Sequence, residues 1–159
     1  MGREVQLVVH WLLVIAYAVA MFVFAGKQES GAAVTAQFLA KWLPHLERAE
    51  IQHLVFWIRK AGHVAAYGLF TLLSFNALRV TSGLRRRALP GAVLLAFAVA
   101  ILDEAYQMRL LHRTGAWSDV LIDGIGIGIT ALGLYYWIAK REKEISQESV
   151  SENKEGPEC

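Results

Sequence analysis

The stretch Leu89–Met108, LPGAVLLAFAVAILDEAYQM, decides the fold because it is apolar for most of its length and then carries two adjacent acids, Asp103 and Glu104. No charged residue occurs from Ala88 to Leu102. A helix of about 20 mostly apolar residues is long enough to cross a bilayer, and this stretch lacks the wide polar face of a surface helix in a soluble protein. The sequence therefore predicts a membrane-spanning helix with carboxylates at one end.

Three other stretches have a similar length and composition, so we predict spans at residues 5–25, 61–78, 89–108 and 120–139. Of the 159 residues, 55% are hydrophobic and 19% are charged, whereas about a quarter of the residues in a soluble domain are charged. We therefore predict an all-α polytopic membrane protein, folded as a four-transmembrane-helix bundle. The net charge of +2 is too small to indicate a nucleic-acid partner, and the single cysteine, Cys159, supports no disulfide framework.

The regions outside the four spans include a long first loop and a charged tail. We assign residues 1–140 to the transmembrane domain and predict that residues 141–159, which are rich in Ser, Glu, Lys and Asn, are disordered. The loop over residues 26–60 is long for a connector, and its apolar residues recur at helical spacing. Because Trp42 and Trp57 suit a membrane interface, we predict one or two short interfacial helices here, with a soluble cap on the bundle as the alternative.

Basic residues near the spans predict the orientation of the chain. An arginine cluster, Arg85–Arg87, lies between spans two and three, and Lys140 and Arg141 follow span four. Cytoplasmic loops of membrane proteins are enriched in Lys and Arg. We therefore predict that both termini are cytoplasmic and that the other two loops lie outside.

This topology brings polar side chains from three spans to the same outer depth of the membrane. Span two begins with polar residues at three- and four-residue steps, which share one helical face. Span three ends with polar residues, and span four begins with them. Ionisable residues inside spans are usually paired and often functional, so we predict a ligand-binding layer, completed by an arginine of the outer loop. Its residues are Lys60, His63, Asp103, Glu104, Gln107, Arg113, Asp119 and Asp123.

These residues also have structural interpretations. Asp103 and Glu104 could anchor the end of span three and pair with Arg109 or Arg113. Lys60 could extend its amino group to the membrane surface. Adjacent residues on a helix point about 100° apart, so only one of the two acids can face a given ligand atom without distortion.

His63 is open to three roles, as a general base, a metal ligand or a hydrogen-bonded structural residue. A histidine with nearby Asp and Glu is a suitable ligand set for zinc. No H-E-x-x-H or comparable spacing supports this role. We therefore predict no cofactor and keep a divalent metal as the less favoured alternative.

Span four contains three glycines at two-residue spacing, Gly124, Gly126 and Gly128. Small residues let helix backbones approach closely in lipid, so we predict a helix-packing seam. The same letters contain a G-x-G, but no strand precedes them, and this disfavours a dinucleotide site.

Four short patterns, taken in order, resemble the VanZ-like family: Lys60-x-x-His63-x-x-x-Tyr67, Asp103-Glu104-x-x-Gln107, Arg113-x5-Asp119 and Asp123-x-x-Gly126. These are small bacterial membrane proteins, named for a member encoded with glycopeptide-resistance genes. The resemblance covers about residues 59–134 and departs at Asp123, where the family often has Asn. It implies a location in the bacterial cytoplasmic membrane and a family-level link to teicoplanin-type resistance, but no reaction.

The leading hypothesis is a membrane protein that is non-enzymatic or of unassigned activity and binds a cell-envelope molecule, lipid-linked or a glycopeptide, in an outer-leaflet pocket. Charge-assisted hydrogen bonds would hold the polar head of this ligand, and the bundle would hold its apolar part. One alternative is a membrane enzyme that acts on a lipid head group by acid/base or metal-assisted hydrolysis. The other is a structural subunit whose polar layer fixes the helix register.

Overall fold

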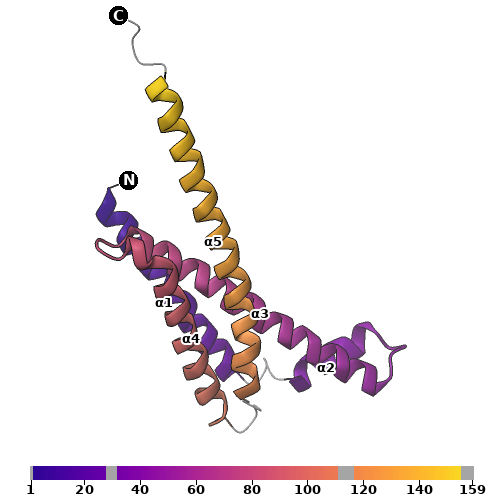
Figure 1. The fold of residues 1–159 in the computed structure, drawn as a ribbon. Coiled ribbons are helices and arrows are strands. Elements are labelled where there is room, and N and C mark those ends of the chain that lie inside the picture. Colours follow the sequence, from indigo (N-terminus) through magenta and orange to yellow (C-terminus); the bar gives the residue numbers. More distant parts are fainter. Residues whose placement is uncertain (1, 28–31, 111–116, 155–159) are drawn as a thin grey trace, which may run out of the picture.

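The computed structural model describes residues 2–27, 32–110 and 117–154, and within these ranges the chain is almost entirely helical and has no strand (Figure 1). The helices are α1 (Arg3–Gly26), α2 (Ala32–Trp42), α3 (Arg48–Val80), α4 (Ala88–Gln107) and α5 (Trp117–Lys154), with a 3₁₀ turn at Arg85–Arg87 before α4. Four of them, α1, α3, α4 with its preceding turn, and α5, are long and apolar enough to cross a membrane. The prediction of an all-α, four-helix membrane bundle is confirmed.

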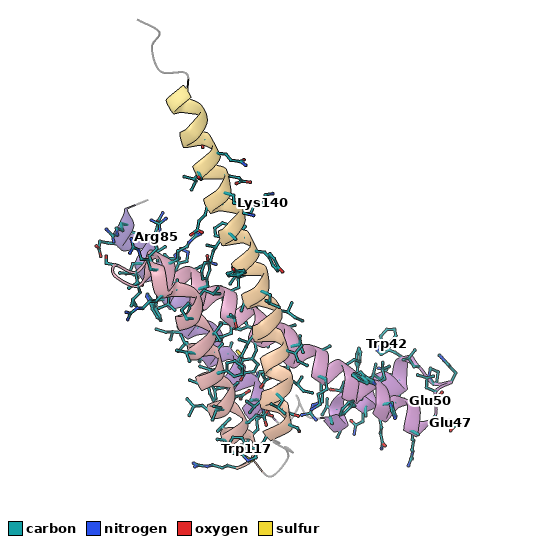
Figure 2. All side chains as sticks on the ribbon, in the orientation of Figure 1. Trp42, Glu47, Glu50, Arg85, Trp117 and Lys140 are labelled. Atoms are coloured by element: carbon teal, nitrogen blue, oxygen red, sulfur yellow. The ribbon has the colours of Figure 1, made fainter. Side chains whose placement is uncertain are left out.

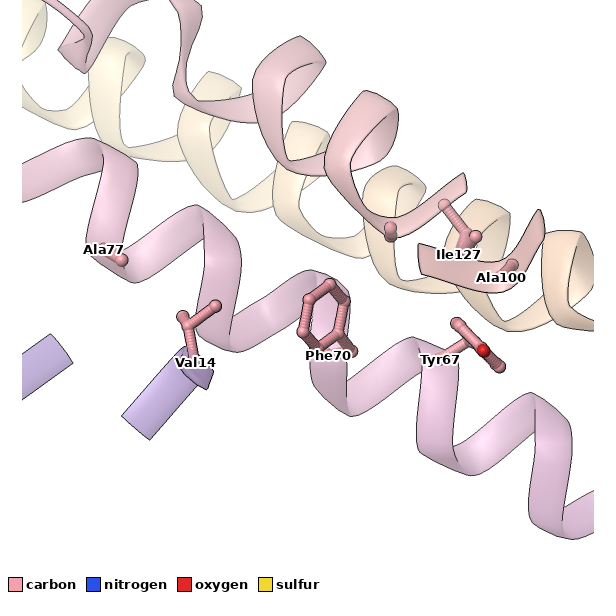
Figure 3. Close-up of a cluster of buried hydrophobic side chains, with 7 residues drawn as sticks. Val14, Tyr67, Phe70, Ala77, Ala100 and Ile127 are labelled. Carbon is pink, nitrogen blue, oxygen red and sulfur yellow. The ribbon is translucent and has the colours of Figure 1, made fainter. Parts of the chain in front are cut away.

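Helix α3 is the centre of the bundle, since it packs against α1, α2, α4 and α5. Figure 3 shows the core that results, in which Tyr67 and Phe70 of α3 lie among Val14 of α1, Ala100 of α4 and Ile127 of α5. The outward face of α1 is apolar instead of polar, with Leu12, Val19 and Val23 among its exposed side chains. Exposed apolar surface on this scale suits a lipid environment.

One face of α4 is a stripe of small residues at four-residue steps. Ala88, Ala92, Ala96 and Ala100 are all almost completely buried. Small side chains allow close helix approach in lipid. The next step along this stripe is Glu104, so the most tightly packed face of α4 places a carboxylate inside the bundle.

The prediction of a short helix in the first loop is confirmed by α2, but the structure differs from the prediction directly before the second span. Residues 48–60 form no separate interfacial helix, because α3 is one helix of 33 residues that continues through them. Its start is fixed by a capping box, in which the Glu50 side chain accepts a hydrogen bond from the Glu47 backbone N–H at 2.8 Å. Helix α2 packs against this extension, and together they project sideways from the bundle (Figure 1). Their position at a membrane interface stays a prediction.

The second difference concerns the C-terminal tail, for which we predicted disorder from residue 141. Helix α5 instead continues to Lys154 and extends well beyond the bundle (Figure 1). Extending a helix that the span has already nucleated is far easier than starting a new one. Glu144 also lies 3.9 Å from both Lys140 and Arg141, and such pairs give an exposed helix a small stabilisation. Residues 155–159 lie outside the described residues.

The bundle has two chemically different ends, with Arg85 near one and Trp117 at the other (Figure 2). We call the first the arginine end, defined by Arg79 and Arg85–Arg87, and the second the carboxylate end, defined by Asp103, Glu104, Asp119 and Asp123. The start of α1 and the far part of α5 lie toward the arginine end (Figure 1). The assignment of this end to the cytoplasm remains a prediction from the distribution of basic residues.

Candidate functional site

Two side chains of α3 reach carboxylates of α5 at the carboxylate end. The Lys60 amino group forms an ion pair with Asp119. One turn deeper, His63 Nδ1 lies 2.8 Å from Asp123 Oδ1. The three-residue step on α3 and the four-residue step on α5 keep both pairs on facing sides of the two helices.

The same face of α3 then reaches α4. The Tyr67 hydroxyl donates a hydrogen bond to Asp103 Oδ2 at 3.0 Å, and Gln107 Nε2 donates to the same oxygen at 3.1 Å. Asp103 therefore bonds across helices to α3 and along its own helix to Gln107. The predicted convergence of polar side chains from three helices is present in the structure.

The acids of this layer are deeply buried. Asp103 is 4% exposed, Asp119 is 8% exposed, and Glu104 and Asp123 are 0% exposed. A charge taken out of water costs several kcal/mol unless partners compensate it. This burial makes the layer a strong constraint on how α3, α4 and α5 pack.

His63, Glu104 and Asp123 form the tightest group of potential ligands in the layer. Each offers one ligand atom, and these atoms all lie within 4.8 Å of one another. The three residues come from three different helices, α3, α4 and α5. Only the folded bundle brings them together.

A cavity of about 290 Å³ opens beside this layer. One wall is apolar and is formed by Met21, Phe24 and Ala25 of α1. The rest of the lining comes from α3, α4 and Thr35 of α2, and it includes Ile58, Gly62 and Ala66 of α3. Besides Thr35, its polar members are Arg59, His63, Tyr67, Asp103 and Gln107.

The eight predicted site residues are not equivalent in the structure. His63, Asp103 and Gln107 line the cavity. Lys60, Glu104, Asp119 and Asp123 belong to the same polar layer but are not among the lining residues. Arg113 lies outside the described residues. The role of all eight in binding a ligand stays a prediction.

A structural role requires that these side chains have partners within the protein. The partners in the structure differ from those that the sequence predicted. Asp103 is bonded to Tyr67 and Gln107, and Lys60 pairs with Asp119 instead of only extending to the surface. Arg109, a proposed partner of the acids, is exposed. The layer thus contains mutual pairs, as a structural role requires, and also borders a cavity, as binding or catalysis requires.

Sequence reasoning missed the cavity residues that carry no polar signal or lie off the quoted patterns. Arg59 could have been found, because it lies four residues before His63 and eight before Tyr67 on the same helical face. The lining residues of α1 offered no such signal, since residues 11–25 of that helix contain no charged side chain.

Gly124, Gly126 and Gly128 of α5 differ in their surroundings, so they do not form one uniform packing seam. A Cβ added to Gly126 would lie 2.0 Å from the Val64 backbone oxygen, so this glycine sets the approach of α5 to α3. A Cβ at Gly124 would meet only the Phe97 ring at 3.3 Å, and a Cβ at Gly128 has no described atom within 4 Å. The packing contact that sequence spacing missed is Gly68 of α3, which faces Thr130 and Gly126.

We expect Tyr67→Phe to lower the free energy of unfolding by about 1–2 kcal/mol, because it removes a hydrogen bond to a buried carboxylate. The matched control is Tyr17→Phe. In the wild type, the half-buried Tyr17 hydroxyl donates a hydrogen bond to the Ala66 carbonyl at 3.3 Å. Its loss should be below about 1 kcal/mol. Thermal melting of both variants in the same detergent measures the difference, and equal losses would contradict the importance of the Tyr67–Asp103 bond.

A family model described as VanZ/LLP1 matches residues 7–139. Among curated proteins, the chain is similar to the uncharacterized membrane protein YwnJ of Bacillus subtilis (strain 168), with 34% identity over 88 residues. This match covers 55% of the chain and 55% of YwnJ, so it spans about half the length of that relative. No solved structure matches the chain.

Proposed function

Because this chain belongs to the VanZ/LLP1 family, and because an amphipathic cavity borders its buried acids, we propose that it binds an amphipathic molecule of the cell envelope in that cavity. The ligand class is a lipid-linked molecule with a polar head group. The bundle is a membrane protein, and we place its carboxylate end at the outer leaflet of the bacterial cytoplasmic membrane, with both termini in the cytoplasm.

The observation that carries this proposal is the mixed lining of the cavity, in which apolar residues of α1 and α3 occur together with polar residues of α3 and α4. The α1 wall presents Met21 and Phe24, which suit an acyl or polyprenyl chain. The α3 and α4 wall presents Tyr67, Asp103 and Gln107, which suit hydroxyl and amide groups. Binding pockets for small molecules commonly combine apolar walls with a few convergent polar groups.

Arg59 gives the cavity a cation for an anionic head group. A guanidinium can hold a phosphate or carboxylate with two parallel hydrogen bonds. A phosphorylated lipid carrier of cell-wall precursors has this combination of an anion and a long apolar chain. A glycopeptide is the second ligand class, for which the support is the family-level link to teicoplanin resistance that the sequence resemblance implies.

The test fills the cavity without disturbing the polar layer. Gly62 lines the cavity, and a Cβ there meets no described atom within 4 Å, so Gly62→Leu should fold and occupy part of the space. Gly128→Leu is the matched control, because its Cβ is equally free and it does not line the cavity. Native mass spectrometry with added polyprenyl pyrophosphate or phosphatidylglycerol would measure binding.

We expect wild type and Gly128→Leu to retain polyprenyl pyrophosphate through a collision energy at which Gly62→Leu has lost it. Phosphatidylglycerol should be displaced by polyprenyl pyrophosphate from wild type. Equal retention by all three proteins would show that the lipid lies elsewhere and would contradict the proposed cavity site.

A second candidate function is a membrane enzyme that acts on the lipid head group. The observation that favours it is the contact of His63 with Asp123, since a carboxylate that orients an imidazole is a common arrangement for a general base. His63 also lines the cavity, where a head group would lie. Release of phosphate from polyprenyl pyrophosphate by wild type and its loss in His63→Gln would support this candidate over simple binding.

A further inference from the structure

We infer that His63, Glu104 and Asp123 form a site for a divalent transition-metal ion, with Zn²⁺ as the preferred occupant. The ligand atoms of these three residues already lie within 4.8 Å of one another in the folded bundle. Two ligands bound to one tetrahedral ion at about 2.1 Å lie roughly 3.4 Å apart. Small side-chain movements therefore suffice to close the group around an ion.

The chemistry of the donor set favours zinc over the common alkaline-earth ions. Ca²⁺ and Mg²⁺ prefer sites built entirely from oxygen ligands. An imidazole nitrogen combined with two carboxylates suits Zn²⁺. Three protein ligands with an open fourth position are the arrangement found in catalytic zinc sites.

A second observation, independent of the proximity of the three residues, supports a cation here. The Asp123 side chain is 0% exposed, and its Oδ2 atom is buried and has no hydrogen-bond partner among the described residues. Buried carboxylate oxygens are normally satisfied by donors or by metals. A bound ion would give this oxygen a partner and would neutralise charge that Asp123 and Glu104 bring into the bundle.

The surroundings of the three residues can hold them in place. Asp103, one residue before Glu104, is fixed by Tyr67 and Gln107, and the Lys60–Asp119 pair closes the layer one turn further out. Such outer partners orient metal ligands and raise their affinity. Because His63 also lines the cavity, the open coordination position can face a ligand there.

This position gives the ion a role toward an anionic head group. A phosphate oxygen could take the open coordination position in place of water. That last step rests on the proposed function, whereas binding of the ion itself does not.

The experiment compares metal content in variants that remove one carboxylate each. Full-length protein in mild detergent would be stripped with a chelator, dialysed against Zn²⁺ and analysed by elemental mass spectrometry. Glu104→Gln and Asp123→Asn remove proposed ligands. Asp119→Asn is the matched control, because it removes a carboxylate from the same layer one turn away on α5.

We expect about one zinc per chain in wild type and Asp119→Asn, and at least a roughly tenfold weaker affinity in the two ligand variants. Absence of stoichiometric zinc in wild type, or equal zinc in all four proteins, would overturn the site. If the ligand variants do not fold, wild type alone still tests the inference. Bound Co²⁺ should give the visible absorption of a four- or five-coordinate ion, and Zn²⁺ should raise the melting temperature; absence of both effects would refute the site.

The cavity variant separates this inference from the proposed function. Gly62→Leu should bind zinc as wild type does, because position 62 is outside the proposed ligand set. Loss of lipid from Gly62→Leu with zinc retained is the result that both proposals predict. Wild type that binds the lipid but no stoichiometric zinc would refute the metal site alone. Stoichiometric zinc in wild type, with equal lipid retention by wild type and Gly62→Leu, would refute the proposed function alone.

Discussion

Gly126→Ala should be among the most damaging single substitutions in the bundle, with a loss of about 3 kcal/mol or more in the free energy of unfolding. The added Cβ would lie 2.0 Å from the Val64 carbonyl oxygen, where Cβ atoms essentially never approach within 3.0 Å. The obstacle is backbone, so no side chain can turn away to make room. Helices α3 and α5 must then separate, and this loosens the contact that aligns their polar residues.

Gly128→Ala is the matched control for this prediction. It adds the same methyl group to the same helix two residues further on, where no described atom lies within 4 Å. Alanine also favours the helix by about 1 kcal/mol relative to glycine. Thermal melting in detergent should show a much lower melting temperature for Gly126→Ala and an unchanged or slightly higher one for Gly128→Ala. Equal melting temperatures would contradict the close α3–α5 approach at Val64.

Asp123→Ala should have the second-largest effect, a loss of about 2–4 kcal/mol. The substitution removes the partner of His63 and leaves the imidazole facing an empty, buried position. Asp123→Asn keeps an acceptor oxygen for His63, so it should cost less than Asp123→Ala. Both substitutions remove the charge, so a larger loss in Asp123→Ala than in Asp123→Asn measures the effect of the hydrogen bond to His63.

Asp119→Ala is the comparison, because Asp119 is paired with Lys60 in the same way one turn further out. Its loss should cost about 1 kcal/mol or less, since the Lys60 amino group can extend toward the membrane surface. Chemical denaturation or thermal melting of the three variants, measured without added metal, gives the order. A larger effect at Asp119 than at Asp123 would mean that burial does not determine the strength of these pairs.

The sequence predicted the four spans well because each is long and mostly apolar, with few ionisable residues inside it. The same reliance on apolar runs made the prediction wrong at residues 48–60. Their charged residues lower the hydropathy, but no proline interrupts the backbone, so α3 continues through them as one helix. The helical tail was missed because its polar composition indicates only that the tail cannot form a buried core. Composition says little about whether an existing helix continues into the tail.

The polar layer was predictable because helical periodicity and an alternating topology fix both the face and the depth of a residue. The individual partners were not predictable. That Asp103 bonds Tyr67 and Lys60 pairs with Asp119 depends on the rotation of each helix about its axis. The close contact at Gly126 sets part of this rotation, and it involves the backbone of Val64, which has no sequence signature.

The alanine stripe that ends in Glu104 also has a consequence for how the chain is built. The uncharged part of α4, residues 88–102, is about 22 Å long as a helix, which is shorter than the hydrocarbon layer of about 30 Å. Beyond it, Asp103 and Glu104 oppose partitioning of this segment into lipid. Helix α3 leaves the ribosome earlier and offers Tyr67 as a partner for Asp103. We expect α4 to enter the bilayer as the second member of a pair, so that membrane insertion and tertiary folding are one event for this helix.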